Sequence, residues 1–366
     1  MELLFKPITI GTLNVKNRFV RSATQDYTGN VNGSISEEEF TLYETLAENQ
    51  VGMIITAHSY VQHPLGRGSI RQNGIFDDHF IPGYQKLADM VRSYGSTLIL
   101  QVSHAGRQVP PDWDPALLPV APSPILDSST GLTPREITDE EIWEAIDAFV
   151  AAMQRSQKAG CDGVQLHIAH GYFLSQFLSP YTNRRLDEWG GSFENRTRIL
   201  REIMLRGRRA VGPHYPILAK LNSTDGFEGP GYLSLEDVVA AAKLLEALGL
   251  SALEISGGIR EAKGVMARPG LKRPEQEAYF APAAKAVKSS VSIPVIIVGG
   301  LRSKTVMNRV IEEGSADMVA LSRPFIKEPN LVQNFLEGAE KVSCISCNAC
   351  FNPKGLACYL DVSQNQ

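Results

Sequence analysis

Eight short β-rich segments recur along the chain, and a longer stretch with helical character separates most of them from the next. They are residues 19–24, 52–56, 97–102, 163–168, 216–221, 252–256, 294–298 and 317–322. Most are nearly continuous apolar runs, as expected for parallel strands that are covered on both faces. The repeat therefore predicts an α/β fold in which eight parallel strands close into a (β/α)8 barrel, the TIM barrel.

Signals for helix starts and ends support the intervening helices. Thr138 and Glu141 have the spacing of a capping box, and Gly160 marks the end of the apolar helical pattern that follows them. Ser36 and Glu39 repeat the same start signal. An open, doubly wound sheet is the competing fold, but the first segment lacks the glycine-rich fingerprint with which such sheets bind dinucleotides.

Two stretches depart from the repeat. Residues 108–135 are rich in Pro, Ser and Asp, and we expect them to leave the barrel as a long loop at the rim of its site. The other stretch is a tail with four cysteines. We expect residues 1–340 to form the barrel with a short N-terminal cap, and residues 341–366 to form a tail packed on it.

Charge and hydropathy favour a small-molecule partner. The 366 residues carry a net charge of −4, and no long run of Lys or Arg suggests nucleic-acid binding. No stretch of 18 or more apolar residues predicts a membrane span, and the start of the sequence does not resemble a secretion signal. We expect a cytoplasmic protein, with a homo-oligomer compatible with the sequence.

Polar side chains follow several of the predicted strands. His167, His170 and Tyr172 lie within six residues at the end of the fourth segment, and Thr24, Gln101, Lys220 and Arg323 stand in or just after others. The carboxyl ends of all the parallel strands lie at the same face of a barrel, so we expect these side chains to converge there. The two imidazoles can donate hydrogen bonds to a substrate oxygen, and the phenol can donate a proton.

The last two strands predict a phosphate site. Gly299 and Gly300 follow the seventh strand, where backbone N–H groups can approach an anion. Ser322 and Arg323 follow the eighth and add a hydroxyl and a guanidinium that can bind phosphate oxygens. Together these positions suggest a cofactor that carries a phosphate.

The chain resembles the old yellow enzyme family of FMN-dependent ene-reductases, and in particular the barrel domain of its 2,4-dienoyl-CoA reductase-like members. The segments that carry the resemblance are Leu4–Pro7, Asn17–Val20, Gln101–Arg107, His167–Tyr172, Phe177–Asn183, Trp189–Arg196 and Ala316–Pro324. They span nearly the whole predicted barrel.

The resemblance implies FMN across the mouth of the barrel. The positions implied to contact the flavin ring are Ser22, Ala23, Thr24, Ala57, Gln101 and Lys220, and those implied to hold its phosphate are Gly299, Gly300, Ser322 and Arg323. Lys220 stands where the family usually has Arg, which keeps a positive charge beside the flavin but loses the planar fork of donors.

The implied reaction has two halves. NADH or NADPH reduces the flavin, and an unsaturated carbonyl or nitro compound then receives the hydride while His167 and His170 hold its oxygen and Tyr172 protonates it. A flavin-dependent amine dehydrogenase and an electron-relay subunit remain alternatives. A zinc hydrolase would also use paired histidines, but acidic ligands at neighbouring strand ends are incomplete.

Four cysteines, Cys344, Cys347, Cys350 and Cys358, crowd the tail. These cysteines resemble the start of the iron–sulfur motif of larger family members, although the gap before the fourth cysteine is shorter here. The sequence leaves three alternatives open: a 4Fe–4S cluster, a zinc site, or free or remnant thiols, of which the last is favoured.

Overall fold

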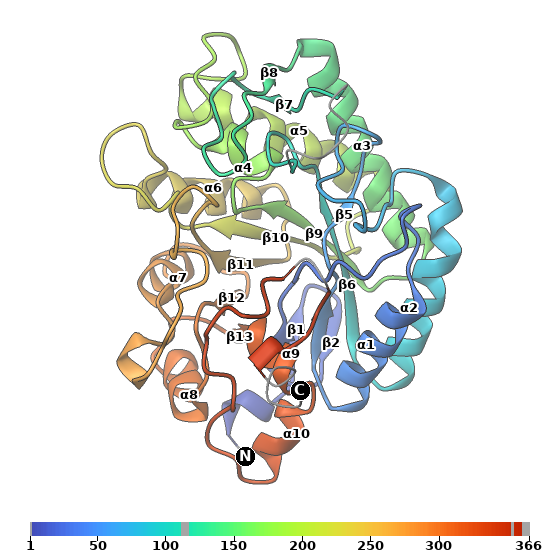
Figure 1. Cartoon of the computed structure of the whole chain (residues 1–366), viewed down its shortest axis with the longest axis vertical. Coiled ribbons are helices and arrows are strands. Elements are labelled where there is room, and N and C mark those ends of the chain that lie inside the picture. Colours follow the sequence, from blue (N-terminus) through green and yellow to red (C-terminus); the bar gives the residue numbers. More distant parts are fainter. Residues whose placement is uncertain (1, 111–116, 353–354, 361–366) are drawn as a thin grey trace.

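The computed structural model of the chain describes residues 2–110, 117–352 and 355–360. Its centre is a closed barrel of eight parallel strands (Figure 1): β3 (Phe19–Arg21), β4 (Met53–Ile55), β6 (Thr97–Ser103), β9 (Gly163–Ile168), β10 (Ile217–Asn222), β11 (Ala252–Ser256), β12 (Val295–Val298) and β13 (Met318–Leu321). The barrel closes where β13 pairs with β3, with Val319 opposite Phe19. Each strand lies within or overlaps one of the eight predicted segments, which confirms the predicted fold.

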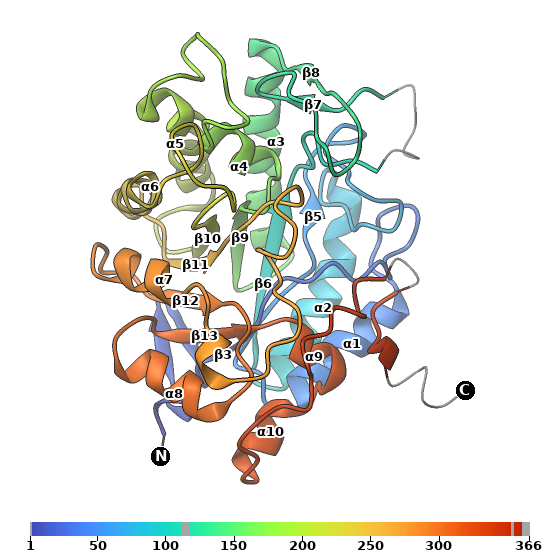
Figure 2. The same cartoon turned by 60° about the vertical axis from the view of Figure 1, so that its left-hand side comes forward.

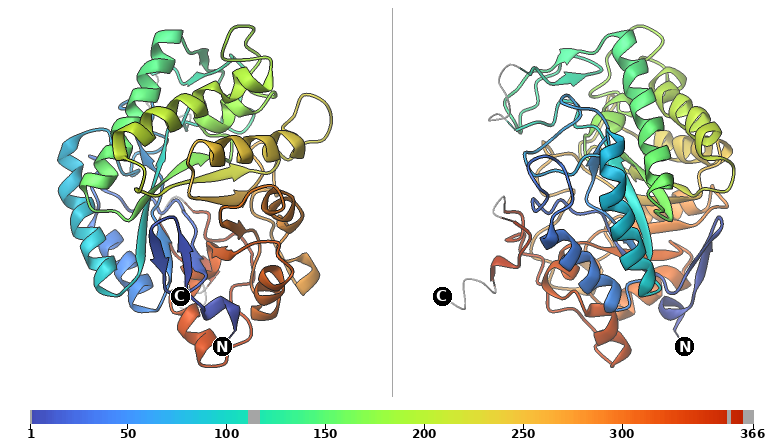
Figure 3. Two further views of the ribbon diagram at one scale, coloured as in Figure 1. Left: turned by 180° about the vertical axis from the view of Figure 1, so that it is seen from behind. Right: turned by 90° about the vertical axis from the view of Figure 1, so that its right-hand side faces the viewer.

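Helices surround the barrel on the outside, as the views from behind and from the side show (Figure 3). They are α1 (Glu37–Glu48), α2 (Ile81–Ser93), α3 (Asp139–Lys158), α4 (Phe173–Leu178), α5 (Phe193–Val211), α6 (Leu235–Ala247), α7 (Ala281–Lys288), α8 (Lys304–Glu312), α9 (Arg323–Lys327) and α10 (Leu331–Leu336). Short 3-10 turns occupy Leu3–Phe5, Asp78–Phe80 and Pro274–Gln276. The capping boxes predicted at Ser36 and Thr138 both form, and they begin α1 and α3.

An N-terminal hairpin covers one end of the barrel. It consists of β1 (Ile8–Ile10) and β2 (Leu13–Val15), and Ile10 and Val15 are fully buried. Both pack in a core cluster with inward-facing strand residues such as Val20, Met53 and Met318. This apolar plug closes the end at which the strands begin, and it leaves the polar carboxyl ends for a site.

The long loop after β6 lies at that other end. It contains β7 (Val120–Ala121) and β8 (Arg135–Glu136), which pair with each other. The short strand β5 (Ser59–Tyr60), from the segment between β4 and β6, pairs with β6. Figure 2 shows this loop and the tail reaching the same side of the barrel. Residues 111–116 of the predicted rim loop lie outside the described residues. Among the described helices, none is long and apolar enough to span a bilayer.

Candidate active site

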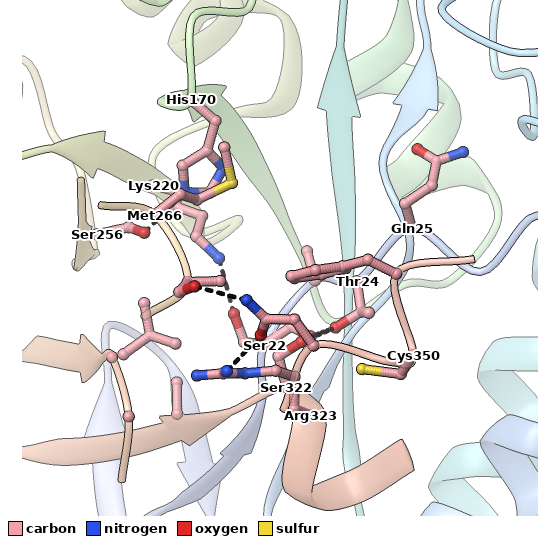
Figure 4. A pocket seen from close by; sticks show the side chains of 18 of the residues that line it. Ser22, Thr24, Gln25, His170, Lys220, Ser256, Met266, Ser322, Arg323 and Cys350 are labelled. Carbon is pink, nitrogen blue, oxygen red and sulfur yellow. Dashed lines mark hydrogen bonds between the residues drawn. The ribbon is translucent and has the colours of Figure 1, made fainter. Parts of the chain in front are cut away.

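A cavity of about 520 Å³ lies at the carboxyl ends of the strands. Residues from the eight barrel strands, or from the segments that follow them, line it together with residues of the tail. Figure 4 shows part of the lining, with Lys220, Thr24 and Ser322 facing a common space. Of the predicted site residues, the lining includes Ser22, Ala23, Thr24, Gln101, His167, His170, Tyr172, Lys220, Gly299, Gly300, Ser322 and Arg323.

Ala57 is the predicted barrel residue that does not line this cavity. Its backbone N–H donates to the hydroxyl of Tyr43 at 2.8 Å, and its side chain is buried. The next residue, His58, lines the cavity instead. The predicted contact of Ala57 with a cofactor therefore has no support from the cavity lining, and His58 is a site residue that the sequence pattern did not single out.

A buried polar network forms the floor of the cavity. Lys220 Nζ donates to Ser22 Oγ at 2.7 Å (Figure 4). It also forms an ion pair with Glu254 Oε1 at 3.0 Å. The side-chain nitrogen of Gln165 donates to the other oxygen of Glu254 at 3.0 Å, and Gln101 donates to the side-chain oxygen of Gln165 at 2.6 Å. Because Glu254 is fully buried, its charge needs a partner inside the barrel, and Lys220 provides the opposite charge. The sequence predicted the cation but not its partner.

Thr24 and Ser322 connect the first and last barrel strands above this floor. Their hydroxyl oxygens are 2.8 Å apart, and the Thr24 hydroxyl also lies 3.0 Å from the backbone oxygen of Ser22. The Arg21 guanidinium donates to the Thr24 hydroxyl. These bonds hold the hydroxyl of Thr24 in a fixed position at the edge of the cavity. A hydroxyl that contacts a planar ligand needs such a fixed position.

The predicted phosphate positions all line the cavity. Gly299 and Gly300 both have positive φ, 135° and 72°. A Cβ at Gly300 would lie 2.6 Å from carbons of Leu271 and Tyr279, so the backbone here is close to its neighbours. Arg323 donates to Asn348 Oδ1 at 2.5 Å and to the backbone oxygen of Arg268 at 3.0 Å. These bonds fix the guanidinium at the cavity wall.

Two imidazoles and a phenol converge in another part of the lining, and Figure 4 shows one of them, His170, on the side opposite Arg323. The ring centroids of His167 and Tyr172 are 4.8 Å apart, and those of His167 and His170 are 5.2 Å apart. His167 Nδ1 is buried without a hydrogen-bond partner among the described residues. His170 Nε2 lies 2.7 Å from Ser256 Oγ, and the unusual φ of His170, 62°, turns its side chain toward β11.

Burial sets the protonation of these groups. It lowers the pKa of His167 and of His170 well below the usual value, and nearby His58 and Lys220 add to the effect. Both rings are therefore neutral at pH 7, and each can donate one N–H. Burial raises the pKa of Tyr172, while the positive charge of Arg260 opposes that rise, so the phenol keeps its proton.

The tail lies against the same wall. Asn348 donates to the backbone oxygen of Ala267 at 2.9 Å, and Gly270 N–H donates to the oxygen of Ser346 at 2.8 Å. Cys344, Cys347, Cys350 and Cys358 line a second cavity of about 190 Å³ beside Arg323, and none forms a disulfide. Within the described ranges, no three or more His, Cys, Asp or Glu side chains are grouped so that they could hold a metal ion. The division at residue 340 and the role of these thiols stay predictions.

Comparisons with known proteins agree with this geometry. The model of the NADH:flavin oxidoreductase / NADH oxidase family matches residues 3–341. An NADH oxidase of Thermoanaerobacter brockii is 39% identical over 347 residues, 94% of this chain and 52% of the relative.

Solved structures show the same fold. A 2-naphthoyl-CoA reductase complexed with 2-naphthoyl-CoA has a TM-score of 0.87 at 31% identity, over 96% of this chain and 54% of that one. An old yellow enzyme homologue of Zymomonas mobilis has a TM-score of 0.78 at 25% identity, over 96% and 98% of the two chains. The chain thus spans about half the length of the oxidase and of the naphthoyl-CoA reductase.

These matches confirm the predicted resemblance and, through the family's description, the predicted flavin. Since the family model covers the barrel from the N-terminal hairpin to the start of the tail, the chain belongs to the NADH:flavin oxidoreductase / NADH oxidase family.

Proposed function

We propose that this chain binds FMN in the large cavity and uses NADH or NADPH to reduce activated C=C bonds of small unsaturated carbonyl or nitro compounds. The observation that carries the proposal is that one cavity is lined both by a glycine pair with Arg323 and by His167, His170 and Tyr172. Figure 4 shows Arg323 and His170 on opposite sides of it. A phosphate-bearing cofactor fits the first end, and a substrate that develops negative charge on oxygen fits the second.

The residues of the cavity fit FMN in charge and in shape. Gly299 and Gly300 line the cavity and pack closely against Tyr279, where a side chain would clash, so their backbone N–H groups are exposed to the cavity without a Cβ to cover them. Ser322 and Arg323 supply further donors. Ser22, Ala23, Thr24, Gln101 and Lys220 would hold the ring, and Lys220 would meet its electron-rich edge. When bound, the flavin supplies reversible acceptance and delivery of a hydride.

The protein's own groups then orient and protonate the substrate. His167 and His170 are neutral donors that would bind its carbonyl or nitro oxygen, where charge grows as the β-carbon is reduced. Tyr172 would deliver a proton to the α-carbon. The 2-naphthoyl-CoA bound in the related reductase is a conjugated thioester, which supports acyl-CoA thioesters as one substrate class to test here.

The direct test of cofactor binding is the purified protein itself. We expect a flavin absorption spectrum, and after heat release we expect FMN rather than FAD by mass, at about one per chain. A colourless protein that does not take up added FMN would contradict the proposal.

Gly300→Ala is expected to weaken FMN binding at least about tenfold, because a methyl group 2.6 Å from Tyr279 would move the ring or the backbone toward the phosphate. Gly314→Ala is the matched control. Gly314 has a similar φ, 66°, with no atom within 4 Å of the added Cβ. Titration of the flavin-stripped variants with FMN measures the difference, and equal affinities in the two variants would contradict the phosphate site.

We also propose that the four tail cysteines are free thiols, with an iron–sulfur cluster and a zinc site as the alternatives. All four line one cavity, which supports a shared role for them. Iron, sulfide and zinc analysis of anaerobically purified protein separates the alternatives, because each predicts a different metal content per chain.

A further inference from the structure

The side chain of Gln108 is held in one orientation that leaves its oxygen unpaired. Gln108 follows β6 and lines the large cavity, and its side-chain nitrogen donates to the backbone oxygen of His170 at 2.6 Å. Gly171 leaves space for this nitrogen, since a Cβ there would overlap it. Because a carbonyl oxygen only accepts, the amide atom that faces it must be the nitrogen. The other amide atom, Oε1, is buried and has no hydrogen-bond partner among the described residues.

A second unpaired atom of the same cavity lies on a neighbouring strand. Among the described residues that line the cavity, the other buried side-chain nitrogen or oxygen without a partner is Nδ1 of His167. Gln108 is 2% exposed and His167 is 4% exposed. Buried polar atoms in native proteins are nearly always paired, so unpaired ones in a binding cavity point to a ligand. A neutral imidazole can donate to that ligand, whereas Gln108 Oε1 can only accept.

The two reactants of the proposed reaction differ in what they offer to such a pair. In NADH or NADPH, the hydride leaves C4 of the dihydronicotinamide ring, and the carboxamide is attached to the neighbouring ring carbon. In an enone, the hydride arrives at the β-carbon, and the carbonyl is attached to the neighbouring α-carbon. Both carbonyl oxygens are therefore the same number of bonds from the carbon that exchanges hydride, and a donor such as His167 suits either. Only the carboxamide adds an N–H donor beside its oxygen.

We propose that Gln108 determines specificity for NADH and NADPH, because its Oε1 accepts a hydrogen bond from the N–H of the nicotinamide carboxamide. This inference rests on the proposed function. A simple enone such as cyclohexenone has no N–H and leaves Oε1 unpaired, so Gln108 favours the nucleotide over the alkene. The same cavity thereby binds two reactants in turn and treats one functional group of the nucleotide differently.

The preference for a carboxamide over an acetyl group tests this role. The 3-acetylpyridine analogue of NADH or NADPH keeps the carbonyl oxygen but has a methyl group in place of the amide nitrogen. Stopped-flow reduction of the FMN-loaded protein gives kred/Kd for the nucleotide and for its analogue, and the ratio of the two values is the preference. In Gln108→Met, the preference should fall about fivefold from that of the unmodified protein, because only the nucleotide loses a hydrogen bond. Comparison of the two ratios cancels the different driving forces of the two hydride donors.

Gln25→Met is the matched control. Gln25 is another glutamine of the cavity lining (Figure 4), but both of its amide atoms already have partners. Its nitrogen donates to Ser69 Oγ at 3.0 Å, and its oxygen contacts Nε2 of His58. We expect the carboxamide preference of this variant to stay within about twofold of the unmodified protein. An unchanged preference in Gln108→Met, or an equal fall in both variants, would overturn the proposal.

Gln108→Lys separates recognition of the nucleotide from support of the His170 backbone. Lysine can still donate to the backbone oxygen of His170, but it has no acceptor. The preference should therefore fall as it does in Gln108→Met, and this variant replaces Gln108→Met if the latter does not fold. A lysine variant with the full preference would overturn the proposal, because the bond to His170 would then suffice.

Binding without reaction gives a second readout. The tetrahydro form of the nucleotide keeps the carboxamide but cannot give up a hydride. Titrated into the oxidised, FMN-loaded protein, it should bind about fivefold more weakly to Gln108→Met than to the unmodified protein, and equal binding would contradict the proposal. Failure of the proposed function is distinguishable, since it would appear as a protein without flavin or with a flavin that neither nucleotide reduces. A flavin that the nucleotide reduces, with the carboxamide preference kept in Gln108→Met, contradicts this inference alone.

Discussion

Tyr172→Phe is expected to slow reoxidation of the reduced enzyme by cyclohexenone at least about 100-fold, while reduction by NADH or NADPH stays nearly unchanged. The phenol is half-buried, and its raised pKa keeps it protonated at pH 7, so it can act as an acid in the half-reaction that needs a proton. Anaerobic stopped-flow absorbance measures the two half-reactions separately.

Tyr27→Phe is the matched control, because Tyr27 is another phenol in the lining of the same cavity. We expect it to slow reoxidation much less than Tyr172→Phe. Equal slowing of both half-reactions in Tyr172→Phe would argue against a role for this residue as the acid and would indicate a change in flavin binding instead.

Lys220→Met is expected to cost about 3–5 kcal/mol of folding free energy, because it leaves Glu254 as an uncompensated charge inside the barrel. Glu254 is fully buried, and Lys220 is the cation that pairs with it at 3.0 Å. Urea unfolding of the flavin-stripped variants measures the loss without a contribution from cofactor binding.

The double variant Lys220→Met/Glu254→Gln isolates the buried charge. The amide keeps the shape of the glutamate and can still accept from Ser22, which lies 2.6 Å from Glu254 Oε1, so much of the lost stability should return. If the double variant is no more stable than Lys220→Met alone, then packing of the lysine stem rather than charge balance explains the loss.

The barrel could be predicted because its signal is local and repeated. Each buried parallel strand must be apolar on both faces, so residues such as 216–221 and 294–298 stand out in the sequence and contain or overlap β10 and β12. The capping boxes at Ser36 and Thr138 are equally local, since each needs side chains only three positions apart.

A site residue could be predicted only where it lies at the end of a predicted strand and within a segment that resembles the family. His167, His170 and Tyr172 met that condition and do converge in the cavity. His58 and Arg260 also line the cavity but did not meet that condition, and each lies more than 80 positions from Tyr172 in the sequence. One signal was available: His58 follows β4 by three residues, as polar residues follow the other strands, whereas the resemblance pointed to Ala57.

The pairing of Lys220 with Glu254 shows a second limit. Both residues lie inside strands, and only the register of β10 with β11 places them directly opposite each other. A sequence pattern gives the faces of a strand but not its register, so the predicted cation appeared without its partner.

The most direct measurement of the central claim is an anaerobic cycle on the unmodified protein. Addition of NADH or NADPH should bleach the visible absorbance of the flavin, and cyclohexenone should then restore it while the saturated ketone forms in equal amount. A protein whose flavin is bleached by neither nucleotide, or whose reduced flavin is not reoxidised by any activated alkene while oxygen is excluded, would contradict the proposed reaction.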